Sequence, residues 1–574
     1  MSERVSPRKC GDGAALGRLV ESGMSDECAL TSGALRDARL DFPRAGGYDP
    51  RSRLQEMCKD LQSSSGPEES PGIRARSDEQ EYAMLHTTTT ARSPRSMMRR
   101  TAAALGATIM LSACAWSNAG LPASADETTE DARDSDVILN MFQWSWTSVA
   151  EECGSTIGPA GFGYVQVSPP QEEIQGTEWW TSYQPVSYQI EGKMGTREEF
   201  AEMVQKCDEA GVGVIADAVI NHTTGADTGA GTGTAGSSYA LDDFPGIYGP
   251  EHFNDCREDI SDYTDRDNVQ NCRLSSLQDL ATGSEEVQDT LAAYMNDLLD
   301  MGVEGFRIDA AKHMPAEDLA AIKSKLSDPD VYWVQEVIGA AGEPIQPSEY
   351  TGTGDVHEFD YGRQLKSAFG GSIAGLDSIA EGKLDSEDAG VFVDNHDTER
   401  NGETLNYKDG DTYTLANDFM LAYDYGRPSV YTGYTFEDFD AGAPGSTATE
   451  VGDASCGAEE WTCTQRLPEI QGMVAFHNAV AGTEVTDWWD DGDNNIAFGR
   501  GEKGFAALNN TEGEVTNTYR SSLPAGTYCN MAAGTDCTET VTVAEDGSFE
   551  AVVPAKGAVA IDVEHMAGPA TAAR

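Results

Sequence analysis

Short apolar runs alternate with amphipathic stretches from about residue 137 to residue 482. Stretches such as "REEFAEMVQKCDEAG" and "EEVQDTLAAYMNDLLDMG" have helical spacing of apolar residues and end in Gly, a common helix terminator. The apolar runs have the length and composition of strands. They cover residues 137–144, 163–168, 212–220, 302–308, 332–338, 355–359, 389–395 and 429–434. Eight strands alternating with helices predict a parallel (β/α)8 barrel, with a doubly wound open sheet as the alternative.

Two segments depart from this alternation. Residues 222–279 are rich in Gly, Thr, Asp and Ser, and a structureless loop of that length is rare in a compact domain. We therefore expect a small subdomain inserted after the third strand. Residues 483–565 have strand and turn patterns without helical spacing, which predicts a separate antiparallel β-sandwich domain. The barrel would then comprise residues 126–221 and 280–482.

The charge is strongly acidic and unevenly distributed. The chain has 39 Lys and Arg against 97 Asp and Glu, a net charge of −58. Residues 1–125 are almost neutral, with 16 basic and 15 acidic groups, so the remainder has a net charge of −59. Such a surface repels nucleic acids and anionic membranes and suits a neutral substrate. We expect a monomer.

The first 125 residues have the features of export. Residues 97–125 combine two arginines, an uncharged apolar stretch and the small-residue site Ala123-Ser124-Ala125, which predicts a signal peptide and secretion. "LSAC", ending at Cys114, is the alternative: a lipoprotein cleavage box that would leave a lipid anchor at the cell surface. Residues 1–96 are interpreted as translated upstream sequence or as a disordered extension. Eight further cysteines without a CxxC pair indicate disulfides rather than a zinc site.

Four predicted strands end in carboxylates. These are Asp217, Asp309, Glu336 and Asp397. Any one of them could cap a helix or lie in a loop, but in a parallel barrel all four would meet at one rim. Arg307 lies two residues before Asp309, so both point to the same side of a strand, where the arginine is expected to keep Asp309 ionised.

Carboxylates with Arg and His, without metal-type spacing or a Gly-rich phosphate loop, favour glycosidic cleavage. That reaction needs one protonated acid for the leaving oxygen and one ionised carboxylate that attacks or stabilises the sugar cation.

Four motifs occur in chain order: "DAVINH", "GFRIDAAKH", "QEVI" and "FVDNHD". Together with "GFGYVQVSPPQE" and "WWTSYQPVSY", they resemble the α-amylases of glycoside hydrolase family 13, in particular the animal and actinobacterial branch. The resemblance runs from about Val137 to Val563. It implies that Asp309 is the nucleophile, Glu336 the general acid/base and Asp397 the carboxylate that stabilises the transition state.

The resemblance also implies roles for the residues around these three. Sugar contacts are expected from the residues of the strand ends and nearby loops: Asp217, Arg307, His222, His396, Tyr183, Trp179, Trp180, Lys312 and His313. Trp179 and Trp180 would form an aromatic platform, although paired tryptophans are more often core residues. Lys312 and His313 would contact sugars on the leaving side.

A structural Ca²⁺ is a further implication of the resemblance. Its expected ligands are oxygens of Asn221, Asp279, Gln270 and the His313 carbonyl, as a hard cation requires. The implied disulfides are Cys153–Cys207, Cys256–Cys272, Cys456–Cys463 and Cys529–Cys537.

The chain departs from chloride-activated relatives at one position. Those relatives use two arginines and an asparagine; Arg307 and Asn395 match, but Ser429 stands at the third position. Arg427, two residues earlier, could replace it only with a change of register. We therefore predict weak or no chloride activation.

The expected activity is endo-acting hydrolysis of α-1,4 bonds in starch and glycogen-type glucans, with retention of configuration. An enzyme that releases one dominant short product, or that transfers instead of hydrolysing, is the alternative within the family. A non-catalytic glucan-binding protein is the alternative from another class, but the three intact carboxylates argue against it.

Overall fold

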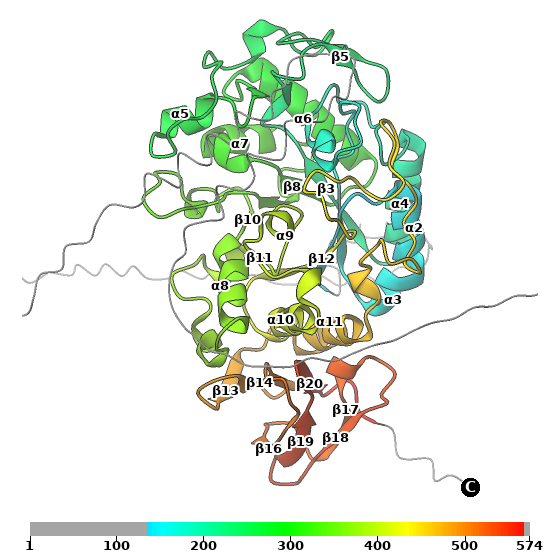
Figure 1. Cartoon of the computed structure of the whole chain (residues 1–574), viewed down its shortest axis with the longest axis vertical. Helices are drawn as coiled ribbons and strands as arrows, with labels where there is room; N and C mark the ends of the chain where they lie inside the picture. Colours follow the sequence, from blue (N-terminus) through cyan, green and yellow to red (C-terminus); the bar gives the residue numbers. More distant parts are fainter. Residues whose placement is uncertain (1–134, 568–574) are drawn as a thin grey trace, which may run out of the picture. The chain divides into compact units, whose positions relative to one another are not determined.

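The computed structural model describes residues 135–567 (Figure 1). The expected upstream extension, the signal peptide and Cys114 lie outside this range. Among the helices of residues 135–567, none has the length and apolar character needed to cross a membrane.

Eight parallel strands form a closed barrel, which confirms the predicted fold class. In order around the barrel they are β1 (Ile138–Met141), β12 (Arg427–Thr432), β11 (Ala389–Phe392), β10 (Asp355–His357), β9 (Tyr332–Gln335), β8 (Gly305–Ile308), β3 (Gly213–Ala218) and β2 (Tyr164–Val167). The first and last strands pair with each other and close the ring. Each run of residues identified from the sequence contains one strand or most of it.

Helices surround the barrel (Figure 1). The principal ones are α2 (Trp146–Glu152), α4 (Arg197–Glu209), α6 (Glu285–Asp300), α7 (Ala316–Lys323), α8 (Phe359–Phe369), α10 (Asp411–Ala422) and α11 (Pro468–Val480). Helix α4 begins with a capping box, in which Thr196 and Glu199 each bond the other's backbone N–H.

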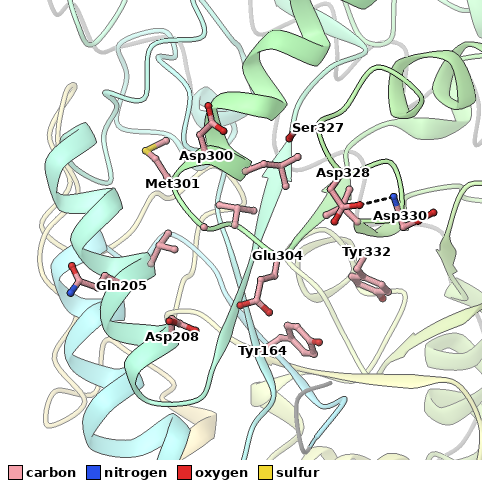
Figure 2. Close-up of a pocket in the computed structure, with 15 residues that line it drawn as sticks. Tyr164, Gln205, Asp208, Asp300, Met301, Glu304, Ser327, Asp328, Asp330 and Tyr332 are labelled. Carbon is pink, nitrogen blue, oxygen red and sulfur yellow. Dashed lines mark hydrogen bonds between the residues drawn. The ribbon is translucent and has the colours of Figure 1, made fainter. Parts of the chain in front are cut away.

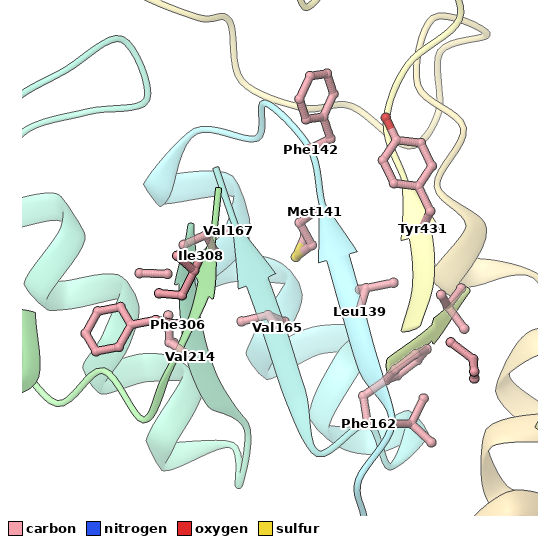
Figure 3. Packing of buried hydrophobic residues seen from close by; sticks show 14 of the residues in the cluster. Leu139, Met141, Phe142, Phe162, Val165, Val167, Val214, Phe306, Ile308 and Tyr431 are labelled. Carbon is pink, nitrogen blue, oxygen red and sulfur yellow. The ribbon is translucent and has the colours of Figure 1, made fainter. Parts of the chain in front are cut away.

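An apolar layer packs between the barrel strands and the helices that surround them (Figure 3). Leu139, Val165, Val214, Phe306 and Ile308 from neighbouring strands are all buried. Strands covered by helices outside and by side chains inside read as continuous apolar runs, which explains why the sequence pattern located them. On β8, Phe306 and Ile308 alternate with Gly305 and Arg307, so Arg307 lies on the face of the strand that points into the barrel.

An inserted segment follows β3. It begins with β4 (His222–Gly225) and ends with β7 (Leu277–Asp279), and these two strands pair antiparallel at the base of the insertion. Between them lie the short strands β5 (Gly231–Thr232) and β6 (Ser238–Tyr239), helix α5 (Arg266–Asn271) and the Cys256–Cys272 disulfide.

The C-terminal part consists of antiparallel strands, as predicted. One sheet contains β13 (Val485–Asp490), β14 (Asn495–Arg500), β15 (Gly504–Asn509) and β20 (Gly557–Asp562). The pairs β16 (Val515–Arg520) with β19 (Ser548–Val553), and β17 (Gly526–Cys529) with β18 (Thr540–Val543), complete it. Phe505 and Phe549 pack between the strands with ring centroids 5.1 Å apart.

Four disulfides are present in residues 135–567. Besides Cys256–Cys272 they are Cys153–Cys207, Cys456–Cys463 and Cys529–Cys537. These are the four pairs that the family resemblance implies.

Candidate active site

Acidic side chains gather at the carboxyl ends of the barrel strands. Asp217 lies in β3, Asp309 directly follows β8, Glu336 directly follows β9 and Asp397 lies beyond β11. Because the strands are parallel, their ends meet at one rim. A cleft of about 480 Å³ opens there, and Asp309, Glu336 and Asp397 all line it.

One buried arginine binds three of these carboxylates. The side chain of Arg307 is 1% exposed, and its Nη1 lies 2.8 Å from both Asp217 Oδ1 and Asp309 Oδ1. Its Nη2 lies 3.1 Å from Glu336 Oε2. Asp217 and Arg307 are register partners on β3 and β8, which explains their direct pairing. The single cation thus fixes the positions of acids from three strands.

Burial dominates the protonation of the carboxyl groups in this cluster. Burial raises the pKa of Asp217 to about 7, although Arg307 opposes the change. Burial and the neighbouring Glu336 raise the pKa of Asp397 to about 7. The cluster therefore retains protons near neutral pH. Protonated and ionised carboxyl groups are both present there, as a reaction that needs a proton donor and an ionised carboxylate requires.

The effect of Arg307 on Asp309 is weaker than the sequence suggested. Arg307 does lower the pKa of Asp309, but burial raises it further, so that the net change is upwards. The expected effect of Arg307 is present, but it is opposed by the cost of removing the carboxylate from water. Removing Arg307 would leave the effect of burial unopposed and would shift Asp309 further towards its protonated form.

The residue after Asp309 has an unusual backbone conformation. Ala310 has φ of 51°, in the left-handed region that non-glycine residues rarely adopt. This turn aims the Ala310 N–H at Glu336 Oε2, at 2.7 Å. The strained residue thus links the loops that carry Asp309 and Glu336, and strain of this kind is common at functional sites.

Two histidines stand next to the acids. His222 Nε2 lies 3.9 Å from Asp309 Oδ2, and His396 Nε2 lies 3.5 Å from Asp397 Oδ2. Burial lowers the pKa of His222 to about 4 and also lowers that of His396, so both rings are neutral near pH 7. His396 stacks on Phe142 and Tyr183, with centroids 4.8 and 5.0 Å away. Neutral imidazoles fixed in this way suit hydrogen bonding to sugar hydroxyls.

Tyr183 and the two tryptophans line the same cleft. The Tyr183 hydroxyl donates to Asp217 Oδ2 at 2.9 Å. Trp179 is only 7% exposed, and its ring packs edge-on against Tyr183, His396 and Phe439. Trp180 is partly exposed. Of the expected two-residue platform, Trp180 therefore presents more surface to the cleft.

Lys312 and His313 lie beside the cleft and are both buried. The Lys312 ammonium donates to Glu343 at 2.5 Å and to the Ile338 carbonyl at 2.7 Å, and it lines a neighbouring hollow with Tyr263. The His313 ring bonds the Val269 carbonyl through Nδ1 at 3.1 Å. Neither residue is among those lining the cleft that contains the three carboxylates.

The four expected calcium ligands lie at the junction of barrel and insertion. Asn221 Oδ1 is buried and has no hydrogen-bond partner among residues 135–567. Asp279 is 2% exposed, and its carboxylate accepts one bond, from Asn254 at 2.7 Å. Gln270 Nε2 donates to the carbonyl of Met314, next to His313, at 3.3 Å. Within this range there is no cluster of three His, Cys, Asp or Glu, but an orphaned buried amide oxygen and a buried carboxylate are the oxygen donors that a hard cation prefers.

Arg427 does not take the place of the missing third chloride ligand. It begins β12, at the opposite end of the barrel from the cleft, and its Nε lies 3.7 Å from Asp355. Its guanidinium also covers the Tyr332 ring, 4.2 Å from the centroid. No change of register brings it towards Asn395.

A second cavity lies at the other end of the barrel. It has a volume of about 900 Å³ and opens among the strand starts (Figure 2). Its carboxylates come from the ends of α4 and α6 and from the segments before β8 and β9: Asp208, Asp300, Glu304, Asp328 and Asp330. None of these residues is buried, in contrast to Asp309 and Glu336 in the cleft.

Sequence reasoning missed one feature of the cleft. Phe439, in the loop after β12, lines it and is 50% exposed. The signal available was an aromatic residue in an acidic, Gly-rich loop, "FEDFDAGAPG", close behind the last barrel strand.

A parallel barrel with buried acids at its rim, and neutral histidines and aromatic rings around them, defines a hydrolase of neutral sugars. Comparisons with known proteins give the family. Residues 168–338 match the α-amylase catalytic domain, and residues 486–564 match the α-amylase C-terminal all-beta domain.

Relatives along most of the chain agree. An α-amylase of Streptomyces violaceus is 51% identical over 433 residues, which is 75% of this chain and 74% of that protein. An α-amylase of Tenebrio molitor is 42% identical over 72% of this chain and 93% of its own length. The crystal structure of α-amylase I from Eisenia fetida has a TM-score of 0.72 at 36% identity, covering 75% of this chain and 98% of that one. The chain belongs to the α-amylase family of glycoside hydrolases.

Proposed function

We propose that the cleft hydrolyses internal α-1,4 bonds of starch and related glucans through a covalent glycosyl-enzyme intermediate. The observation that carries the proposal is the shared guanidinium. Arg307 binds Asp309 and Glu336 through its two terminal nitrogens, at 2.8 and 3.1 Å. This arrangement supports the short carboxyl separation, about 5–5.5 Å, that retention of configuration needs.

Each acid has a distinct role in this proposal. Asp309, beside Arg307, attacks the anomeric carbon. Glu336, held by the Ala310 N–H, first protonates the leaving oxygen and then takes a proton from the incoming water. Asp397, whose side chain is 35% exposed towards the cleft, stabilises the sugar cation. His222 and His396 donate to sugar hydroxyls, and Trp180 provides an apolar surface for a neighbouring ring.

Calcium has a structural role in the proposal. Asn221, Asp279, Gln270 and the His313 carbonyl would hold it between the barrel and the inserted segment. A cation held by these oxygens would offset their buried negative charge and would tie the insertion to the barrel beside the cleft. The residues of the insertion then keep the cleft wall that includes His222 in place.

The chain is proposed to act outside the cell as a monomer. Four disulfides support an oxidising compartment. A free secreted form and a form anchored at Cys114 both remain compatible with the sequence. We place the domain boundaries where the sequence pattern predicts them, at residues 221/222, 279/280 and 482/483.

The test compares the full chain with Asp309→Asn and Glu336→Gln on soluble starch in the presence of calcium. Both variants should lose activity by at least about 10³-fold, because each removes a group that acts in the transition state. Asp360→Asn, a change at an acid outside the cleft, should retain full activity. Unchanged turnover by Asp309→Asn, in a protein that melts as the parent does, would refute the mechanism.

A further inference from the structure

Phe439 is an exposed aromatic ring in the wall of the cleft. Half of its surface is open to solvent, and it lines the cleft together with Trp179 and Trp180. Single exposed apolar residues are common, but this one is continuous with other aromatic rings in a site for a polymer. Its ring lies edge-on to Trp179, with centroids 6.2 Å apart. The open face therefore extends an existing aromatic surface.

The loop that bears Phe439 is fastened to the tryptophan pair. The Trp179 indole N–H donates to the Phe439 carbonyl at 2.9 Å, and the Trp180 indole N–H donates to Asp440 at 3.1 Å. The two loops also touch at Gly442, where a Cβ atom would lie 2.0 Å from the Thr177 carbonyl oxygen. A residue larger than glycine would push the loops apart, so their contact is built into the sequence.

A buried cation holds the same loop from behind. The Arg400 side chain is 0% exposed, and its Nη1 donates to the Phe439 carbonyl at 3.1 Å and to the Ala441 carbonyl at 3.5 Å. Its guanidinium lies 4.0 Å from the centre of Phe436 and 5.5 Å from that of Trp179. Its Nε and Nη2 have no hydrogen-bond partner within residues 135–567. The Glu399 carboxylate, 3.7 Å from Nε, and the aromatic faces together offset part of the cost of burying this charge.

Arg400 also belongs to the catalytic rim. It lies three residues after Asp397, on the short helix α9 (Thr398–Asn401), and its N–H bonds the Asp397 carbonyl at 3.1 Å. One residue thus contacts both the segment of the proposed transition-state acid and the loop of Phe439. Movement of this arginine would displace the aromatic ring relative to Asp397.

We propose that Phe439 is a sugar-binding residue that sets the chain-length preference of the cleft, with Arg400 as its positioning residue. The open ring stacks on the apolar face of a glucose unit on the Trp179–Trp180 side of the scissile bond, so only chains long enough to reach it gain from the contact. The inference rests on the proposed function, since it assigns a further contact for the same α-glucan substrate.

The test uses the full chain and measures kcat and KM on each oligosaccharide from maltotriose to maltoheptaose. Phe439→Ala should raise KM on maltoheptaose about tenfold, the factor that corresponds to about 1.4 kcal/mol of lost binding. The effect should become smaller as the substrate shortens, and the product pattern from maltoheptaose should shift. Phe439→Trp should restore the preference for long chains. Leu241→Ala removes another exposed apolar side chain, 51% exposed and outside the cleft, and should behave as the parent.

Arg400→Lys tests the positioning role, since it keeps the charge but cannot hold both carbonyls in the same way. It should reproduce the length-dependent rise in KM seen with Phe439→Ala. A purely structural role would instead lower the melting temperature and reduce kcat equally on all lengths.

The outcomes separate this inference from the proposed function. A loss in Phe439→Ala that is equal on all substrates, or no loss at all, would overturn the role of Phe439 while leaving the hydrolase intact. A parent chain that hydrolyses none of the oligosaccharides would overturn the proposed function and this inference with it.

Discussion

Removing Arg307 should move the pH dependence of catalysis to higher pH. Arg307 is the one cation within ion-pair distance of Asp217, Asp309 and Glu336 in the described part of the chain. At an effective dielectric constant of 20, a charge pair at 4 Å is worth about 4 kcal/mol, and an opposite charge this close lowers a carboxyl pKa by about 1–3. Arg307→Gln should therefore shift the acidic limb of the kcat/KM profile to higher pH by about 1–3 pH units.

The magnitude at fixed pH follows from this shift. Asp309 already has a raised pKa because of burial, so a further rise leaves less of it ionised near pH 7. The loss in kcat/KM should therefore be largest at acid pH, where the protonated form of Asp309 prevails, and should be partly recovered at alkaline pH. Leaving a buried charge cluster without its partner should also cost about 3–5 kcal/mol of folding free energy.

The assay is the full pH profile of kcat/KM on soluble starch, together with denaturant unfolding of each variant. Arg307→Lys is the matched control, because it keeps the charge but not the two-nitrogen contact, and should shift the limb less than Arg307→Gln. An acidic limb that stays where it is in Arg307→Gln, with activity reduced equally at every pH, would refute the electrostatic role assigned to this residue.

Four further predictions concern stability and ions. Chelation with EGTA should lower the melting temperature of the full chain, and added calcium should restore it. Asn221→Ala should melt at the same temperature with or without calcium. A parent protein whose melting temperature does not respond to chelation would contradict the calcium assignment. Chloride added to a chloride-free enzyme should leave the rate almost unchanged, since Ser429 stands at the third ligand position and Arg427 pairs with Asp355; a large increase would show this to be wrong. Replacing Cys153 and Cys207 by serine should lower the free energy of unfolding by about 4 kcal/mol in denaturant titrations, because that bridge closes a loop with a sequence separation of 54. A loss below about 1 kcal/mol would argue against this source of stability. Asp217 has a pKa of about 7 in the folded protein against about 3.9 in the unfolded chain, so the folded state binds more protons and the folding free energy weakens as the pH rises through this window. In urea melts, Asp217→Asn should therefore become more stable relative to the parent from about pH 4 to pH 8. A difference in stability that stays constant over this range would exclude the linkage.

The strand ends could be predicted from the sequence because their signal is local. Eight apolar runs, each closed by polar residues, placed Asp217, Asp309, Glu336 and Asp397 on one rim before any contact was known. The four cysteine pairs and the C-terminal strands also agree with the expectation.

The features that were not predicted depend on contacts between distant segments. That Trp179 is almost buried follows from its packing on Phe439, 260 positions further along the chain. The pKa of Asp309 is raised because the whole rim buries its carboxyl group. The sequence shows the neighbouring Arg307 but not this burial. The loop after β12 could be identified as a loop from its composition, but its contact with Arg400 required the closed barrel.

The most direct test of the account is a time course of the full chain on soluble starch, in which viscosity, product lengths and anomeric configuration by NMR are followed together. The account predicts an early fall in viscosity with short oligosaccharides that are released as α-anomers. Release of β-anomers would contradict the proposed covalent intermediate on Asp309. Starch binding without turnover, with calcium present, would contradict the hydrolase itself.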